Sequence, residues 1–264
     1  DTPYVAKEDI SGSSWVSKTL DANTVENFII NTLSDAGTEA TFSAAGTISL
    51  IRSCYVSVNK VAVLYRAATG PLGYLVIGTV EPRTMAITWG TPVSLGGDIG
   101  STAMKRIADD HLVIAYRNVG TNAVNVRAVT VSGTVPTIGT ADAPFSQNAS
   151  SQGYIAVEAI SATKLVIAVR ETSVANKGYV YAINVSGTTL SGGGASIEWL
   201  QTGAGAAVSS IAIAKVDTDK CVVFCRNETD ANKGKGSWVV ATGGVLSAAT
   251  EVEIDANASS NFKA

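Results

Sequence analysis

The 264-residue chain contains few of the residues on which most enzyme chemistry depends. It has one histidine, His111, and three cysteines, Cys54, Cys221 and Cys225. A single histidine largely excludes histidine-based catalytic triads, paired-histidine zinc sites and facial iron triads, so we expect His111 to be a solvated turn residue. Three cysteines cannot all pair, which excludes a disulfide framework, and we expect small buried thiols instead.

Charged and aromatic residues are also scarce, at 16% and 6% of the chain, and the formal net charge is −3. Lysine and arginine form no basic stripe, which excludes sequence-independent nucleic-acid binding. No apolar run approaches the roughly 18 residues of a membrane helix, so no membrane span is expected. Hydrophobic residues nevertheless make up 46%, with 25 glycines, which predicts short buried strands joined by tight turns.

The chain contains an internal sequence repeat. An apolar run that closes on an arginine occurs four times, as Asn59–Arg66, Asp110–Arg117, Thr163–Arg170 and Asp219–Arg226. The closing arginines lie roughly 50 residues apart, a period typical of arrays built from one repeated supersecondary unit.

The pattern of apolar runs in each unit predicts four short antiparallel strands. The third unit has four such runs, over Ala103–Ala108, Leu112–Tyr116, Val124–Val131 and Thr134–Phe145. The pair Ser132-Gly133 indicates a tight hairpin before the fourth run, because glycine tolerates a positive φ. In the second and fifth units the fourth strand is expected over Met85–Leu95 and Val245–Ile254, and the third strand of the fifth unit over Ser237–Ala241.

A four-stranded sheet with two apolar faces must be packed between two similar sheets, and radial stacking around an axis achieves this. The sequence therefore predicts an all-β fold, a five-bladed β-propeller of four-stranded antiparallel blades, as a single domain over residues 1–264. An array of β-sandwich modules or a β-solenoid fits a period of roughly 50 residues less well. The expected repeats cover approximately residues 1–47, 48–98, 99–151, 152–205 and 206–258.

The two ends of the chain depart from the repeat. Tyr4-Val5-Ala6 matches Tyr154-Ile155-Ala156, but Leu20 stands at the arginine position of the first unit. Terminal repeats are expected to be atypical. Residues 259–264 begin a further copy, which either closes the ring within one chain or is donated to a neighbouring subunit. The residues assigned to this assembly strand are Asn261, Phe262, Lys263 and Ala264.

The repeated arginines are the candidate ligand-binding residues, together with two tryptophans at related positions of the fourth strands. An arginine that closes an apolar strand face can reach a carbonyl or carboxylate at the blade edge, or it can form a polar pocket between blades for an acidic or hydroxyl-rich ligand. The tryptophans can pack between blades or stack on sugars. The variable loops between second and third strands are expected to form the binding face. The candidates are Arg66, Arg117, Arg170, Arg226, Trp89 and Trp199.

Paired carboxylates occur at Asp109-Asp110, Asp217–Asp219 and Glu251–Glu253. Glycosidases need two carboxyls at a defined separation, but these pairs fall at turns or alternate on outer strands, which indicates solvated edge charges. Asp217-Thr218-Asp219 lacks the remaining ligands of a calcium loop. The sequence therefore predicts no catalytic residues, no metal and no cofactor.

Turn motifs give the units a signature, seen in Val131-Ser132-Gly133-Thr134, Val185-Ser186-Gly187-Thr188 and Trp89-Gly90-Thr91. This signature resembles the propeller-type repeats of bacteriophage tail-fibre and virion-surface proteins and of some secreted bacterial lectin-like proteins. The resemblance implies an extracellular or virion-surface location.

The resemblance also implies a non-enzymatic binding or structural module that recognises a cell-surface glycan or a partner protein. One alternative is a filament or assembly subunit, and hence a homo-oligomer, joined through the C-terminal strand. The other is a carbohydrate-active propeller enzyme, which near-equivalent repeats disfavour because catalysis needs one asymmetric site.

Overall fold

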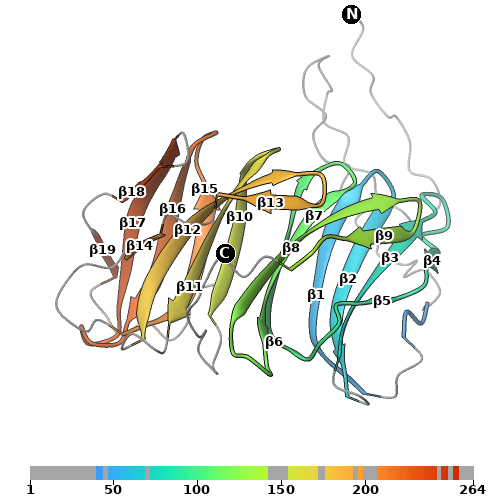
Figure 1. The fold of residues 1–264 in the computed structure, drawn as a ribbon, viewed down its shortest axis with the longest axis horizontal. Helices are drawn as coiled ribbons and strands as arrows, with labels where there is room; N and C mark the ends of the chain where they lie inside the picture. Colours follow the sequence, from blue (N-terminus) through green and yellow to red (C-terminus); the bar gives the residue numbers. More distant parts are fainter. Residues whose placement is uncertain are drawn as a thin grey trace, which may run out of the picture.

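The computed structural model describes residues 40–43, 47–68, 72–141, 154–171, 176–192, 196–198, 207–242, 245–248 and 252–255. These residues are all-β and form four antiparallel sheets, which lie side by side in chain order (Figure 1). Among them no helix is long and apolar enough to cross a membrane. Most of the first expected repeat and all of residues 259–264 fall outside the described residues, so five blades and a closing or donated strand stay predictions.

The strands of the first sheet are β1 (Ile48–Ser57), β2 (Lys60–Ala67), β3 (Gly73–Val80), β4 (Ile87–Trp89) and β5 (Val93–Ser94). Those of the second are β6 (Ile99–Ala108), β7 (His111–Asn118), β8 (Val124–Ser132) and β9 (Val135–Ile138). The third contains β10 (Ile155–Ser161), β11 (Lys164–Glu171), β12 (Lys177–Ser186), β13 (Thr189–Ser191) and β14 (Ser196–Glu198). The fourth contains β15 (Val208–Lys215), β16 (Lys220–Asn227), β17 (Lys233–Thr242), β18 (Val245–Ala248) and β19 (Val252–Asp255).

The fourth strand differs from the expectation of one continuous run. In the first sheet it is broken into β4 and β5, which both pair with β3. Gly90 and Pro92 lie between the two segments, and proline has no amide hydrogen to donate to the ladder. The third strand of the fifth unit begins at Lys233 rather than at Ser237, because Gly234 and Gly236, weak strand formers, continue the pairing with β16.

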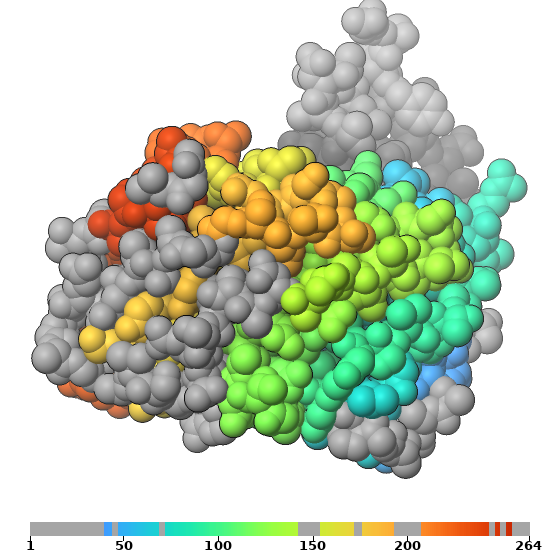
Figure 2. Space-filling model, in the orientation of Figure 1, coloured from blue at the N-terminus to red at the C-terminus, as the bar shows by residue number. Residues whose placement is uncertain are grey.

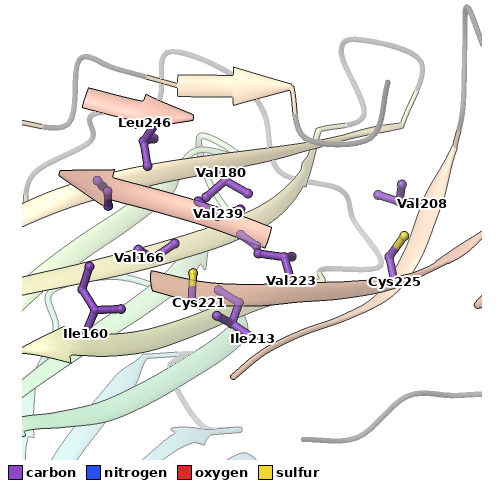
Figure 3. Packing of buried hydrophobic residues seen from close by; sticks show 13 residues of the cluster. Ile160, Val166, Val180, Val208, Ile213, Cys221, Val223, Cys225, Val239 and Leu246 are labelled. Atoms are coloured by element: carbon purple, nitrogen blue, oxygen red, sulfur yellow. The ribbon is translucent and has the colours of Figure 1, made fainter. Parts of the chain in front are cut away.

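The second strands of the second and third sheets, β7 and β11, are covered on both faces, as their continuous apolar runs predict, whereas β16 is fully covered on one face only. In β11, Leu165, Ile167 and Val169 face the second sheet, while Val166 and Ala168 face the fourth. Figure 3 shows the second of these interfaces, where aliphatic side chains of the third and fourth sheets surround both Cys221 and Cys225. This alternation gives consecutive sheets a shared core.

The first strands of consecutive sheets contact each other along one edge, β1 with β6, β6 with β10 and β10 with β15. Side chains reinforce this edge: Lys105 Nζ lies 2.7 Å from Glu158 Oε2, and Arg52 Nε donates to the Thr102 carbonyl oxygen at 3.1 Å. The sheets are therefore arranged with their first strands together, as radial stacking requires.

The repeated turn signature joins each sheet to the next. A Cβ atom on Gly90 would lie 2.5 Å from the carbonyl oxygen of Thr134, and one on Gly139 would overlap the carbonyl oxygen of Thr188. Thr134 and Thr188 are the last residues of the two Val-Ser-Gly-Thr turns. The Gly-Thr pair that follows the fourth strand of one sheet therefore contacts the Val-Ser-Gly-Thr turn of the next sheet. Figure 2 shows the segments around β9 and β13 adjoining on one face of the molecule.

Candidate functional site

The four repeated arginines lie at the same end of the sheets, where each second strand ends. Arg66, Arg117 and Arg170 each share a strand face with apolar residues that pack toward the next sheet, as Arg117 does with Val113 and Ala115. Arg226 occupies the corresponding position on the outer face of the fourth sheet, opposite to the face that contacts the third.

Arg66 and Arg117 are held by oxygen atoms of nearby loops. Arg66 Nε and Nη2 donate to Asp98 Oδ1 and Oδ2 at 2.6 and 2.8 Å, a two-pronged pair that ties the first sheet to the segment leading into β6. These hydrogen bonds raise the pKa of Arg66 further. Arg117 Nη1 donates to Asn122 Oδ1 at 3.1 Å.

Arg170 and Arg226 converge on one carboxylate, Glu228. Arg170 Nη2 lies 3.8 Å from Glu228 Oε2, and Arg226 Nη2 donates to Glu228 Oε1 at 3.3 Å. The Arg170 guanidinium also lies 5.6 Å from the centre of the Tyr154 ring. The arginines thus fix loops of their own and neighbouring sheets, while their role in ligand binding stays a prediction.

Trp89 is partly buried and packs against the outer core of the first sheet. Its Nε1 donates to the carbonyl oxygen of Ala40 at 3.0 Å, and its ring meets Phe42 edge-on with centroids 5.5 Å apart. A Cβ on Gly78 would lie 2.6 Å from the indole, so glycine makes room for it. Stacking of Trp89 on a sugar stays a prediction. The other candidates, Trp199, Asn261, Phe262, Lys263 and Ala264, lie outside the described residues.

The paired carboxylates of the described residues each meet a cation. Asp110 Oδ1 accepts from Ser57 Oγ at 2.6 Å and from Lys60 Nζ at 3.0 Å, and these two bonds lower the pKa of Asp110. Asp109 pairs with Arg106, and Glu253 lies 3.0 Å from Lys233 Nζ. No three His, Cys, Asp or Glu side chains in the described ranges lie close enough together to hold a metal ion. These are the contacts of structural ion pairs.

A hollow of about 550 Å³ lies between the second and third sheets, at the end opposite to the arginines. Its polar lining consists of His111, Thr163, Asn184, Ser186 and Ser191, and its apolar walls include Ile107, Ala162 and Val185. A smaller hollow of about 380 Å³ lies beside the β12–β13 hairpin and is lined by Thr140, Ala141, Thr188, Thr189 and Leu190. Both hollows are built from strand ends and tight hairpins.

The tautomer of His111 follows from its one close contact. Nδ1 lies 2.9 Å from the carbonyl oxygen of Asp109. A carbonyl only accepts hydrogen bonds, so Nδ1 carries the proton and Nε2 of the neutral ring is an acceptor. His111 therefore offers the hollow a hydrogen-bond acceptor.

Sequence reasoning missed this hollow. It predicted a solvated turn residue at His111, which does contact the carbonyl oxygen of Asp109 in its turn. It predicted the binding face at the loops between second and third strands, at the other end of the sheets, and that placement stays a prediction. The available signal was the departure from the repeat, because lysine occupies this position in three other units, at Lys60, Lys164 and Lys220.

No family model matches the chain, and no curated protein matches it. Among solved structures, the chain is similar to a fucose-specific lectin from Aleuria aurantia, with a TM-score of 0.39 and 12% sequence identity over 78% of this chain and 79% of that one. A mutant of the Aleuria aurantia lectin, in complex with Fucα1-6GlcNAc or with α-methyl-L-fucoside, gives the same TM-score, identity and coverage.

Proposed function

We propose that the chain is a non-enzymatic binding module, a five-bladed β-propeller that recognises glycans or a partner protein at the surface of a virion or cell. The observation that carries this proposal is the hollow between the second and third sheets. Its described lining combines hydroxyl, amide and imidazole groups with aliphatic walls and includes no carboxylate.

The chemistry of this lining favours binding over catalysis. A volume of about 550 Å³ falls in the range of small-molecule sites, which are mostly apolar with a few placed polar groups. Hydroxyl and amide groups match the hydroxyls of a sugar, and the aliphatic walls match its C–H faces. Glycoside hydrolysis requires two carboxyl groups on either side of the bond, and this lining supplies neither.

Two outer sheet faces support the five-bladed ring. On the fourth sheet, Phe224 is partly covered, while Trp238 and Ile254 are 46% and 51% exposed. On the first sheet, the face away from the second carries Val63, Tyr65 and Val76. Those three residues are already buried, at 0–7% exposure, so the exposed face of the fourth sheet is the one that a further sheet would cover. Residues 1–47 carry the repeat pattern that would supply that sheet.

The same exposed face favours the second candidate, an assembly subunit. A neighbouring copy would then cover Trp238 and Ile254, with residues 261–264 donated between chains. Sedimentation of the purified chain separates the two, because ring closure predicts a monomer and donation predicts an oligomer. Loss of the oligomer on deletion of residues 261–264, with the melting temperature retained, would support donation.

A glycan array with the purified chain tests the proposed function. Binding to one class of glycan supports it. A folded chain that binds no glycan on the array contradicts glycan recognition and leaves a partner protein or a structural role.

A further inference from the structure

At two of the three described interfaces between sheets, the lysine that begins a second strand contacts the next sheet. Between the first and second sheets, Lys60 Nζ lies 3.0 and 3.2 Å from the two carboxylate oxygens of Asp110. Between the third and fourth, Lys164 Nζ donates to the carbonyl oxygen of Ala241 at 2.9 Å. The long lysine side chain thus fills the space between sheets at this end.

Between the second and third sheets the described residues form no such lysine contact, because the residue that begins β7 is not a lysine. His111 replaces the lysine, and Thr163 stands where the neighbouring sheets have Asp110 and Asp219. The backbone fixes this equivalence: the carbonyl oxygens of Asp110, Thr163 and Asp219 accept from the amides of Val131, Val185 and Ala241, at 2.9, 2.8 and 2.8 Å.

We infer that His111 and Thr163 create a ligand site for a neutral, hydroxyl-rich small molecule, of the size of a monosaccharide, between the second and third sheets. In this inference Lys60 and Lys164 close the equivalent spaces at the other interfaces. The inference rests on the proposed function and names the residues that make its site.

The charge of the hollow determines the class of ligand. A lysine and an aspartate have both been lost relative to the interface of Lys60 with Asp110, and the lining beside the imidazole of His111 carries only hydroxyl, amide and aliphatic groups. Taking a charged ligand out of water without a counter-charge is costly, so a neutral ligand is favoured. His111 Nε2 accepts a hydrogen bond from such a ligand, while Thr163 and Ser186 each donate and accept.

The double variant H111K/T163D tests the inference by restoring the lysine and aspartate of the closed interface. Titration calorimetry with the methyl glycosides of fucose, galactose, glucose, mannose and N-acetylglucosamine is the measurement. Wild type is expected to bind at least one glycoside, and the double variant is expected to lose about ten-fold or more in affinity, since its new side chains occupy the hollow. The control K220H makes the opposite exchange at the matching position of the fourth sheet and is expected to leave binding unchanged.

Two outcomes of these binding experiments separate failure of the inference from failure of the proposed function. If wild type binds a glycoside and H111K/T163D binds it equally well, the inference is overturned while the proposed function stands. If wild type binds no glycoside in the calorimeter and no glycan on an array, the proposed function is overturned in its glycan form, and the inference with it. Should H111K/T163D melt at a much lower temperature than wild type, T163V provides the test, because it removes only the hydroxyl: an affinity loss supports the inference and unchanged affinity opposes it.

Discussion

The α-carbon of Gly139 lies against the carbonyl oxygen of Thr188, so closely that a Cβ atom on Gly139 would overlap that oxygen. Gly139 follows the last strand of the second sheet, and Thr188 lies in the β12–β13 turn of the third. Gly90 and Thr134 repeat the relationship between the first and second sheets. The close spacing of consecutive sheets therefore requires glycine, which has no side chain, at these two positions.

Gly139→Ala is expected to lower the free energy of unfolding by about 1–3 kcal/mol, because the new methyl group forces the β12–β13 turn away from the second sheet. Urea unfolding followed by tryptophan fluorescence measures the change. Gly97→Ala is the matched control, since a Cβ there meets only Asn118 Nδ2, at an ordinary 3.6 Å. Equal stability of the two alanine variants would show that the Gly139 contact is not needed.

Arg66→Lys is expected to destabilise the chain by about 0.5–1 kcal/mol, because an ammonium group cannot reproduce the two parallel bonds of the guanidinium to Asp98. The pair is partly exposed, with side-chain exposures of 33% and 20%, so the difference from wild type is expected to shrink in 1 M salt. The same exchange at the exposed Arg83 is the control. A loss at Arg66 that persists unchanged in salt would contradict the electrostatic explanation.

Glu171 is expected to make stability depend on pH in the mildly acidic range. Burial raises the pKa of Glu171 above its ordinary 4.5, although Tyr181 Oη donates to its Oε1 at 2.7 Å; its buried Oε2 has no partner. The folded state thus holds this proton more tightly than the unfolded state. Glu171 therefore destabilises the folded state least below pH 4.5, where it is protonated in both states. The free energy of unfolding that its ionisation removes grows as pH rises through the folded pKa.

Glu171→Gln removes this titration, so its unfolding free energy relative to wild type is expected to rise between pH 4.5 and neutral pH. Urea unfolding at several pH values measures the difference. A difference that is constant with pH would show that Glu171 does not titrate differently in the two states.

The buried thiols are expected to react slowly. Burial raises the pKa of Cys221 to about 12, so little thiolate forms at pH 8, and Cys225 lies in the same core. Labelling with Ellman's reagent is expected to modify these two cysteines only when urea unfolds the chain. Rapid labelling of the folded protein at Cys221, located by mass spectrometry, would contradict the packing of the third and fourth sheets.

The sequence predicted the second strands well, because a covered strand needs a near-continuous apolar run and such runs end at recognisable turns. It predicted the fourth strands poorly, since it took Met85–Leu95 as one strand although Gly90 and Pro92 interrupt the pairing with β3. For the hollow, the sequence shows only that His111 departs from the repeated lysine, and it does not show which residue lies opposite. His111 and Thr163 are 52 residues apart, and only the stacking of two sheets shows that they replace one ion pair.

The most direct test of the central claim is a crystal structure of the chain with a glycan selected on an array. The account predicts electron density for the sugar between the second and third sheets, beside His111 and Thr163. Density at the opposite end, against Arg66 or Arg170, would contradict it and would place the binding site at the repeated arginines.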